Sequence, residues 1–285
     1  MLLNSTQNYV HERNLYSLCK KLHLFAGTYK NSFLLFFLLI AFFQSKSQID
    51  YLNLPVGTAT TYNGANSLII ENRRFTNINN AVNQNGNILR FFNCSNIIIR
   101  NCFFGEASGG DQGGDRAIYF NGSSNITVEN CLFSDQGGAV LVSSHGNGMV
   151  IRNNEFMNVR GPYPKGNFIQ MNSCSGSGYV IENNRGENWF GESYPEDLVS
   201  NYMSSGTVAS PILVQDNLWR GGGSSRTGGG GLAGDHGGSN ITIQRNKLIN
   251  PGQYGLSIVG GNNNKILNNW IWSDQKPWSA GALPV

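Results

Sequence analysis

The chain has 285 residues, of which 13% are charged and 36 are glycine. Little charge combined with much glycine excludes an ordinary helical globular protein and also a highly charged disordered chain. The net charge of +3 comes from residues 1–47, which hold five of the 20 basic and one of the 17 acidic residues; 15 basic and 16 acidic residues follow. That balance does not suit a nucleic-acid-binding surface, so we expect no nucleic-acid partner.

Residues 1–47 are predicted to be a secretory signal peptide with an N-terminal extension. An unbroken apolar run occupies residues 33–43, with lysines before it and a Ser-Lys-Ser sequence after it. This order of segments is typical of a signal peptide. The run is shorter than the roughly 20 apolar residues of a membrane span, although an uncleaved anchor is the alternative. We therefore expect a secreted protein (extracellular, periplasmic or on the cell surface) with no membrane contact after cleavage.

A short pattern recurs eight times after residues 48–66, which we interpret as a lead-in or cap. Each copy reads apolar, any residue, apolar, polar, and Asn or a substitute, with a large apolar residue three positions further on. Consecutive copies are 23 to 33 residues apart, and periods in this range indicate a solenoid. The copies occupy residues 68–75, 97–104, 126–133, 149–156, 179–186, 212–219, 241–248 and 265–272.

The repeat unit is built from short strands. A second strand-like run follows most copies, for example at residues 117–120 and 139–142, and Gly and Asn separate the runs. No segment after residue 48 shows a long 3.6-residue periodicity, which excludes helical and leucine-rich solenoids. We predict an all-β parallel β-helix of about eight coils over residues 67–285. The sequence ends soon after the eighth copy without an obvious cap, which allows for further coils in a longer protein.

The fifth position of each copy is where the chain is expected to bend. Alternation places Ile97 and Ile99 on the inward face just before it. Asn tolerates left-handed backbone angles, and its amide can both donate and accept hydrogen bonds. We therefore expect a ladder of stacked amides at this position, formed by Asn72, Asn101, Asn130, Asn153 and Asn183.

The last outward position of each copy alternates in charge over the first five coils. Opposite charges on stacked neighbours stabilise a sheet by roughly 0.2–1 kcal/mol per pair, and a slip by one coil would oppose like charges. We interpret this row as structural. Its members are Glu71, Arg100, Glu129, Arg152 and Glu182, followed by Gln215, Gln244 and Asn268.

Four cysteines follow the predicted signal peptide, and no Cys or His spacing resembles a zinc site. Cys102 and Cys131 fall at the same position of successive copies. We expect them to be stacked free thiols in the interior. A disulfide between coils, which an exported protein permits, is the alternative.

The unit at residues 95–104 (SNIIIRNCFF) and its near copy at 124–133 (SNITVENCLF) resemble the right-handed parallel β-helix repeats of the pectate-lyase-like superfamily. The resemblance covers roughly residues 64–285 and implies a right-handed coil. It implies little about function, since this superfamily includes lyases, glycoside hydrolases, epimerases and non-catalytic surface proteins. Residues 161–261 also resemble a group of uncharacterised exported bacterial β-helix proteins. The basic signature of pectate lyases and the triple aspartate of polygalacturonases are both missing from the sequence.

The loops of coils 4, 5 and 6 are the candidate functional region. Adjacent coils lie about 4.8 Å apart, so these loops should rise beside one another. They combine aromatic rings, cations and carboxylates, the mixture that a sugar-binding groove needs. The candidate substrate-binding residues are Arg160, Tyr163, Trp189, Tyr194, Arg220 and Arg226; the candidate catalytic residues are Lys165, Glu196, Asp197, Asp235 and His236.

Two reactions on a polysaccharide fit these residues. β-Elimination on an acidic chain needs cations for the uronate and a base for the C5 proton, for which Lys165 is the first candidate and His236 or Tyr194 the alternatives. Hydrolysis needs two carboxylates, either Asp197 with Asp235 or Glu196 with one of them. A non-catalytic glycan-binding or structural β-helix of the cell surface is the alternative function.

Calcium is the one cofactor that the composition suggests, because carboxylate oxygens are the ligands that this ion prefers. Asp197 with Asp235 could hold a Ca²⁺ ion between two loops. A second pair, Asp111 and Asp115, lies in one glycine-rich loop. No other cofactor is expected, and the expected partner is the polysaccharide or glycan itself.

Overall fold

The computed structural model describes residues 49–76, 88–105, 116–161, 166–189, 192–221 and 228–273. The chain divides into two units, Met1–Ile49 and Asp50–Val285, and all described residues except Ile49 belong to the second. The predicted signal peptide lies outside the described residues. Within the described ranges, no helix has both the length and the apolar character needed to cross a membrane.

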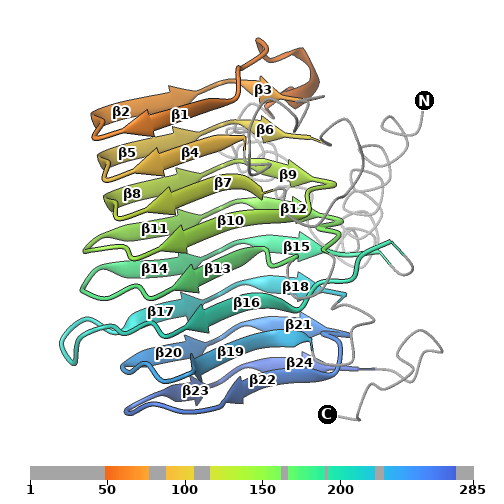
Figure 1. The fold of residues 1–285 in the computed structure, drawn as a ribbon. Coiled ribbons are helices and arrows are strands. Elements are labelled where there is room, and N and C mark those ends of the chain that lie inside the picture. The colour runs from red at the N-terminus through yellow and green to blue at the C-terminus, as the bar shows by residue number, and fades with distance from the viewer. Residues whose placement is uncertain are drawn as a thin grey trace, which may run out of the picture. The chain divides into compact units, whose positions relative to one another are not determined.

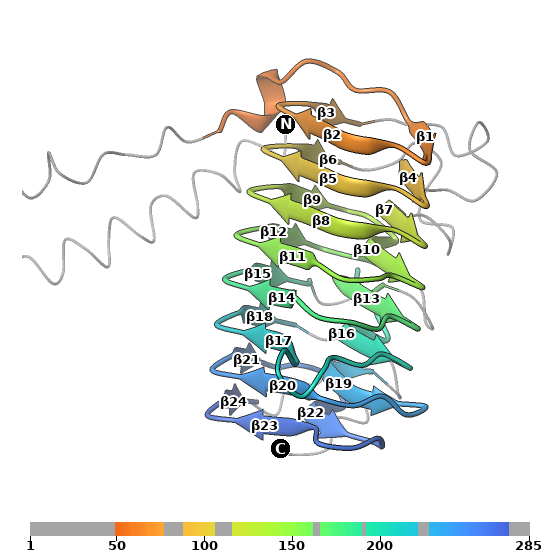
Figure 2. The same cartoon turned by 90° about the vertical axis from the view of Figure 1, so that its left-hand side faces the viewer.

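The second unit is a stack of coils in which every strand pairs in parallel with its counterpart in the next coil (Figure 1). Three eight-stranded sheets run along the stack, and a turn of the view shows the same order of coils from β1–β3 to β22–β24 (Figure 2). A short 3₁₀ helix, η1 (Tyr51–Asn53), precedes them. The predicted all-β parallel solenoid is confirmed.

The three sheets differ in the length of their strands. Sheet I contains β1 (Thr60–Asn63), β4 (Leu89–Phe92), β7 (Arg116–Asn121), β10 (Gly138–Ser143), β13 (Ile169–Asn172), β16 (Asp197–Tyr202), β19 (Gly229–Asp235) and β22 (Tyr254–Ile258). Sheet II contains β2 (Asn66–Glu71), β5 (Ser95–Arg100), β8 (Ser124–Glu129), β11 (Met149–Arg152), β14 (Tyr179–Glu182), β17 (Ile212–Gln215), β20 (Ile241–Gln244) and β23 (Lys265–Leu267). Sheet III contains β3 (Arg74–Phe75), β6 (Phe103–Phe104), β9 (Leu132–Ser134), β12 (Glu155–Met157), β15 (Arg185–Glu187), β18 (Leu218–Arg220), β21 (Lys247–Ile249) and β24 (Trp270–Trp272).

The core is filled by columns of like side chains, one from each coil. Ile97 and Ile99 are fully buried, as the alternation predicts. The large apolar residue that ends each copy lies inward from sheet III, where stacked rings have centroids 4.9–5.0 Å apart, close to the coil spacing. Stacked rings bury much area and add a direct attraction, so this column stabilises each coil against the next. The column begins with Phe75, Phe104, Phe133 and Phe156.

The fifth copy lacks the large residue of this column, because it ends in Gly186. The ring of Phe168, at the start of sheet I, fills the space instead: a Cβ built on Gly186 would lie 2.8 Å from its Cζ. Phe168 stacks on Phe156 at 5.2 Å and contacts Trp219 of the next copy at 5.3 Å. The imperfect copy is therefore compensated from a neighbouring strand.

The bend after sheet II has the predicted backbone, but the amide ladder lies one residue further on. Asn72, Asn101, Asn130, Asn153 and Asn183 all have φ between 52° and 55°. Their side chains remain at the surface, where only Asn101 donates to Asn72, at 3.3 Å. The buried ladder consists of the next residue in each coil, namely Asn154, Asn184, Asn217, Asn246 and Asn269.

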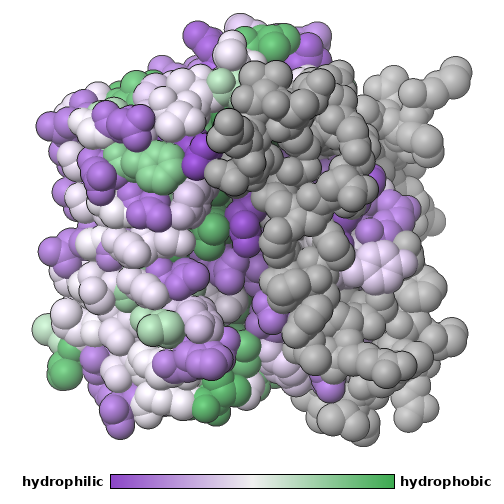
Figure 3. All heavy atoms as spheres, in the orientation of Figure 1, coloured by the Kyte–Doolittle hydropathy of each residue, from purple (hydrophilic) through white to green (hydrophobic). Residues whose placement is uncertain are grey.

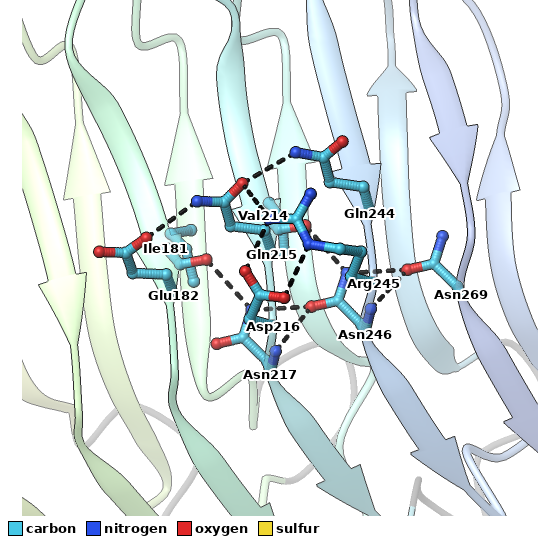
Figure 4. A network of polar contacts seen from close by, with 10 residues as sticks. All are labelled: Ile181, Glu182, Val214, Gln215, Asp216, Asn217, Gln244, Arg245, Asn246 and Asn269. Atoms are coloured by element: carbon cyan, nitrogen blue, oxygen red, sulfur yellow. Dashed lines mark hydrogen bonds and ion pairs between the residues drawn. The ribbon is translucent and has the colours of Figure 1, made fainter.

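The amides of Asn154, Asn184, Asn217 and Asn246 each donate two hydrogen bonds and accept from the amide or backbone of a neighbouring coil. Figure 4 shows the ladder from Asn217 to Asn269. Asn217 donates to Asn246 Oδ1 at 2.9 Å and to the carbonyl of Ile181 at 3.1 Å, and its Oδ1 accepts from the amide of Asn184. A buried polar group costs free energy unless it is paired, and a chain of paired amides removes that cost. In coils 2 and 3 the same position is occupied by Cys102 and Cys131.

The eighth copy is shifted by one residue from its predicted place. Lys265 pairs with Thr242 and Ile266 with Ile243, so the copy begins at residue 264. The bend residue is Asn268, with φ 54°, and Leu267 rather than Asn268 takes the last outward position. A slip of one residue exchanges the two faces of a strand, and Ile266 instead of Leu267 therefore packs against the core.

The outward row of sheet II is a polar ladder, as predicted. Arg100 binds Glu71 at 2.6 Å and Arg152 binds Glu129 at 2.8 Å. In later coils amides replace the charges, and Gln215 donates to Glu182 Oε2 at 2.9 Å (Figure 4). On the described surface in Figure 3, apolar residues are scattered among polar ones.

The four cysteines after the predicted signal peptide are free and buried: Cys94, Cys102, Cys131 and Cys174. For Cys102 and Cys131 this confirms the prediction of free interior thiols. Cys131 is fully enclosed, and burial raises the pKa of its thiol well above the usual value. The thiols behave as small apolar groups whose Sγ atoms contact backbone carbonyls, as Cys102 does with Arg100 at 3.3 Å.

Candidate functional site

The loops that lead from sheet III to sheet I lie along one edge of the β-helix, which we call the loop edge. Its described parts are residues 158–161 and 166–168, 188–189 and 192–196, 221 and 228, and 250–253. These loops are in direct contact from coil to coil. A Cβ on Gly166 would lie 2.7 Å from the Cα atoms of both Gly161 and Pro195, and the amide of Tyr194 donates to the carbonyl of Arg160 at 2.6 Å.

The loop edge brings together part of the predicted site. Arg160, Trp189, Tyr194, Glu196 and Asp197 come from its loops in successive coils. Arg220 ends β18 beside the edge, where it forms an exposed ion pair with Glu187 at 2.9 Å. Three predicted site residues, Tyr163, Lys165 and Arg226, lie outside the described residues.

Asp197 is the innermost carboxyl group of the loop edge. It begins β16, only 2% of the residue is exposed, and Oδ1 accepts hydrogen bonds from the Tyr254 hydroxyl and, at 3.1 Å, from the Gly229 amide. The sheet register explains this contact, since Asp197, Gly229 and Tyr254 start successive strands and are aligned. Gly229 has to be glycine, because a Cβ there would lie 2.5 Å from the Tyr254 ring.

Burial sets the protonation of this carboxyl group. It raises the pKa of Asp197 from 3.8 to about 7, against the opposing effect of the Tyr254 hydrogen bond. Burial also raises the pKa of Glu196, the preceding residue, and of the Tyr254 hydroxyl. A carboxyl group that titrates near neutrality can both give and take a proton, and such groups are concentrated at functional sites.

The stability of the protein should depend on this group. Between pH 4 and 7 the unfolded chain has released the Asp197 proton while the folded chain keeps it. The contribution of Asp197 is therefore fully present below pH 3.8 and is lost as the pH rises through about 7, by about 4 kcal/mol for this shift. Asp197→Asn removes the dependence, because Asn cannot ionise. Urea unfolding from pH 4 to 8.5 measures the free energy of unfolding of both proteins. That of Asp197→Asn should rise relative to that of the wild type as the pH rises.

A variant with the opposite sign provides the control for this measurement. A hydrogen bond from Arg245 lowers the pKa of Asp216, an exposed carboxylate. The stability that Asp216 contributes is present above its unfolded pKa and is lost as the pH falls. From pH 4 to 8.5 the free energy of unfolding of Asp216→Asn should therefore differ from that of the wild type by a nearly constant amount, and the variant should gain on the wild type only below about pH 4. Parallel pH profiles of the wild type and Asp197→Asn would contradict the expected role of burial at Asp197.

A second polar cluster lies on the loop edge in coils 3 to 5. Arg160 binds Asp135 at 2.8 Å, and the buried Asn158 donates to Asp135 Oδ1 at 2.8 Å and to Glu192 Oε2 at 2.9 Å. Ser193 donates to Asn158 Oδ1 at 2.6 Å. The substrate-binding candidate Arg160 is therefore held by a carboxylate of coil 3. Asn158 joins the loop of coil 4 to that of coil 5 through Glu192 and Ser193.

The structure does not bring Asp235 and His236 to the loop edge. Asp235 ends β19 and pairs with Tyr202, whereas Asp197 pairs with Gly229 at the opposite end of the same two strands. The His236 ring contacts that of Tyr202 at 5.0 Å. The register therefore separates Asp197 from Asp235 along the strands, which does not favour the predicted pairing of their carboxyl groups across one glycosidic bond or around one Ca²⁺ ion. The Asp235 charge still contributes to the raised pKa of Asp197, as a smaller cause than burial.

Calcium finds little support in the ranges that the structure describes. They contain no group of three or more His, Cys, Asp or Glu side chains that could hold a metal ion. The other predicted pair, Asp111 and Asp115, lies outside those ranges.

Tyr254 is the residue of the site that sequence reasoning missed. It lies two coils beyond Asp197 and is the first residue of β22. The available signal was the glycine run at residues 228–231, because glycine inside a strand marks a close approach by another group.

Comparison with known proteins identifies the class of this chain. Residues 47–194 match the family described as the right handed beta helix region, and the chain belongs to that family. None of the curated proteins matches the sequence. Among solved structures, the crystal structure of PfbA, a surface adhesin of Streptococcus pneumoniae, is similar over 80% of this chain and 74% of that one, with 12% identity and a TM-score of 0.38.

Proposed function

We propose that this chain is an exported β-helix protein that binds a polysaccharide along the loop edge and cleaves it, with Asp197 and Tyr254 transferring the proton. The observation that carries the proposal is the convergence of residues from three coils. Tyr194 and Glu196 lie on one loop that ends at Asp197, and this loop packs against the glycine run that opens β19. Tyr254 reaches Asp197 from the coil beyond that glycine run. This arrangement combines rings for stacking on sugars with groups that move protons.

The proton path needs the Asp197–Tyr254 hydrogen bond to reverse its direction. In the structure the Tyr254 hydroxyl donates to Asp197 Oδ1, whereas in the reaction the protonated Asp197 would donate to the Tyr254 oxygen. Breaking a glycosidic bond by hydrolysis or by β-elimination leaves an oxygen that must be protonated. The Tyr254 hydroxyl would give its proton to that oxygen and take the proton of Asp197, which would end as the carboxylate. Asp197 is buried, so Tyr254 is the member of the pair that would face the substrate. In hydrolysis Glu196 would be the second carboxylate; in β-elimination Lys165 would be the base.

The second candidate function is glycan binding without cleavage, as in a structural β-helix of the cell surface. Two observations favour it: Asp197 is almost fully covered, and Asp235 lies at the other end of the sheet. On this view the Asp197–Tyr254 hydrogen bond joins coils 5 and 7 across Gly229 and has a structural role alone.

A polysaccharide panel on residues 48–285 separates these functions. We expect cleavage of at least one acidic polysaccharide. Ultraviolet absorbance of unsaturated products would identify β-elimination, and new reducing ends without absorbance would identify hydrolysis. Retained glycan affinity without either product would contradict cleavage and support the binding function. The panel is run with and without Ca²⁺, and dependence on the ion would revive the calcium prediction.

A further inference from the structure

Arg116 stands out among the cations on the outer face of sheet I. It begins β7, and its side chain lies across Gly138 of the next coil, where a built Cβ would be 3.1 Å from the Arg116 Cγ. The guanidinium then reaches one coil further, and Nη2 donates to Gln170 Oε1 at 3.2 Å. Gln170 is aligned with the outward residues Leu141 and Tyr119, so the guanidinium lies on the outer surface of the sheet.

This guanidinium has no carboxylate partner among the described residues. Five of the described arginines bind acidic side chains, for example Arg100 with Glu71 and Arg160 with Asp135, and Arg74 donates to the backbone carbonyl of Leu52. The neighbours described for Arg116 are instead the neutral side chains of Gln170 and Tyr119. Burial lowers the pKa of Arg116, because its cation is partly removed from water and the described part of the chain gives it no carboxylate partner. Such a cation costs free energy unless an anion binds it.

The position of Arg116 relates it to the proposed proton-transfer pair. Arg116 and Asp197 both begin strands of sheet I, and β7, β10, β13 and β16 are consecutive in that sheet. Three steps of about 4.8 Å place them about 14 Å apart along the axis of the helix. Gly138, aligned with Arg116, and Asn167, whose amide donates to the carbonyl of Asp197 at 2.8 Å, occupy the intervening strands or their starts. A sugar chain that follows the axis would pass both groups.

We propose that Arg116 binds a carboxylate of an acidic polysaccharide, several sugar residues from the point of cleavage, and so selects uronate-containing chains. The proposal rests on the proposed function for the location of the groove. Gln170 holds the guanidinium by one of its five N–H groups, which leaves others for the two oxygens of a carboxylate. Tyr119 lies beside it, and its ring provides a face for the adjoining sugar.

The test compares the binding of polygalacturonate and alginate with that of their carboxyl-reduced forms, measured by calorimetry on the wild type and on Arg116→Gln. Arg116→Gln should weaken binding of an acidic polymer about tenfold or more and leave any binding of the reduced polymer unchanged. Arg116→Lys keeps the charge without the planar set of donors of a guanidinium group. Its affinity for the acidic polymer should lie between those of the wild type and Arg116→Gln. The matched control is Arg100→Gln, which removes an outward cation of sheet II that is already paired, and it should bind like the wild type.

The outcomes separate this inference from the proposed function. Equal binding by the wild type and Arg116→Gln, or no preference for acidic over reduced polymers, would overturn the role of Arg116 even if the protein cleaves a polysaccharide. If Arg116→Gln no longer binds the acidic polymer and no variant cleaves it, the proposed role of Arg116 is supported and cleavage is refuted. Thermal melting verifies the fold. Removing a partly buried cation without a carboxylate partner should not lower the melting temperature of Arg116→Gln. If it does, the binding of Arg116→Lys is compared with that of the wild type instead.

Discussion

Asp197→Asn is expected to abolish most of the cleavage activity while leaving the protein folded. Asn keeps an oxygen that accepts from the Gly229 amide and the Tyr254 hydroxyl, so the local geometry is retained. It has no proton to pass to Tyr254 at any pH. General acid catalysis contributes typically 10²–10⁴-fold, and we expect kcat to fall by about that factor. Initial rates on the substrate identified by the panel, measured with equal amounts of folded protein, give this ratio.

Binding and the second member of the pair provide the controls. The Kd for the polysaccharide should change little in Asp197→Asn, because the carboxyl group is buried and Tyr254 would face the sugar. Tyr254→Phe, which keeps the ring over Gly229 and removes the hydroxyl, should lose activity to a similar extent. Asp235→Asn, at the other end of the sheet, should retain wild-type rates. Full activity in both Asp197→Asn and Tyr254→Phe would leave the hydrogen bond a structural role alone.

The repeat made the fold predictable because a solenoid repeats its own environment. Each copy contacts only the copies above and below it. The inward and outward positions of one copy therefore predict the core residues of all eight coils. The inward pair at Ile97 and Ile99, the left-handed bend residues and the polar ladder from Glu71 to Glu182 all follow from alternation and from the conformational freedom of Asn. None of these features depends on contacts between distant parts of the sequence.

The errors came from places where adjacent positions carry the same residue type. Asn153 and Asn154 are both amides, and composition does not say which one turns inward after the bend. In two coils Cys102 and Cys131 occupy the inward position instead of Asn, so the sequence does not show a continuous row of amides at that position. In the eighth copy two consecutive asparagines, Asn268 and Asn269, allow either register, and the pairing of Ile266 with Ile243 decides between them.

The candidate site was only partly predictable, for a related reason. Loop residues such as Asp197 could be proposed because alignment of the coils places consecutive loops side by side. Tyr254 could not, since its contact with Asp197 depends on a ring lying across Gly229. Asp235 was grouped with Asp197 because both belong to coils with long loops. The strands run between them, and the length of β19 keeps them at opposite ends of the sheet.

Val128→Asp is expected to unfold the coils around β8. Val128 is fully buried in sheet II and is aligned with Ile99 on one side and Ile151 on the other. An unpaired carboxylate there must either remain charged in an apolar column or take up a proton against its ordinary pKa, and in both cases a valine's packing is lost. We expect the free energy of unfolding to fall by about 4 kcal/mol or more.

The same strand contains the control that distinguishes a buried charge from a poor strand residue. Thr127 points outward between Ile98 and Val150, so Thr127→Asp places the same carboxylate in water and should cost about 1 kcal/mol or less. Because each coil is stabilised by its neighbours, the damage from Val128→Asp should spread to both. Hydrogen exchange should then show lost protection in β5, β8 and β11 while β20 and β23 remain protected. Equal melting temperatures of Val128→Asp and Thr127→Asp would mean that the buried side chains of sheet II do not stabilise the stacking of the coils.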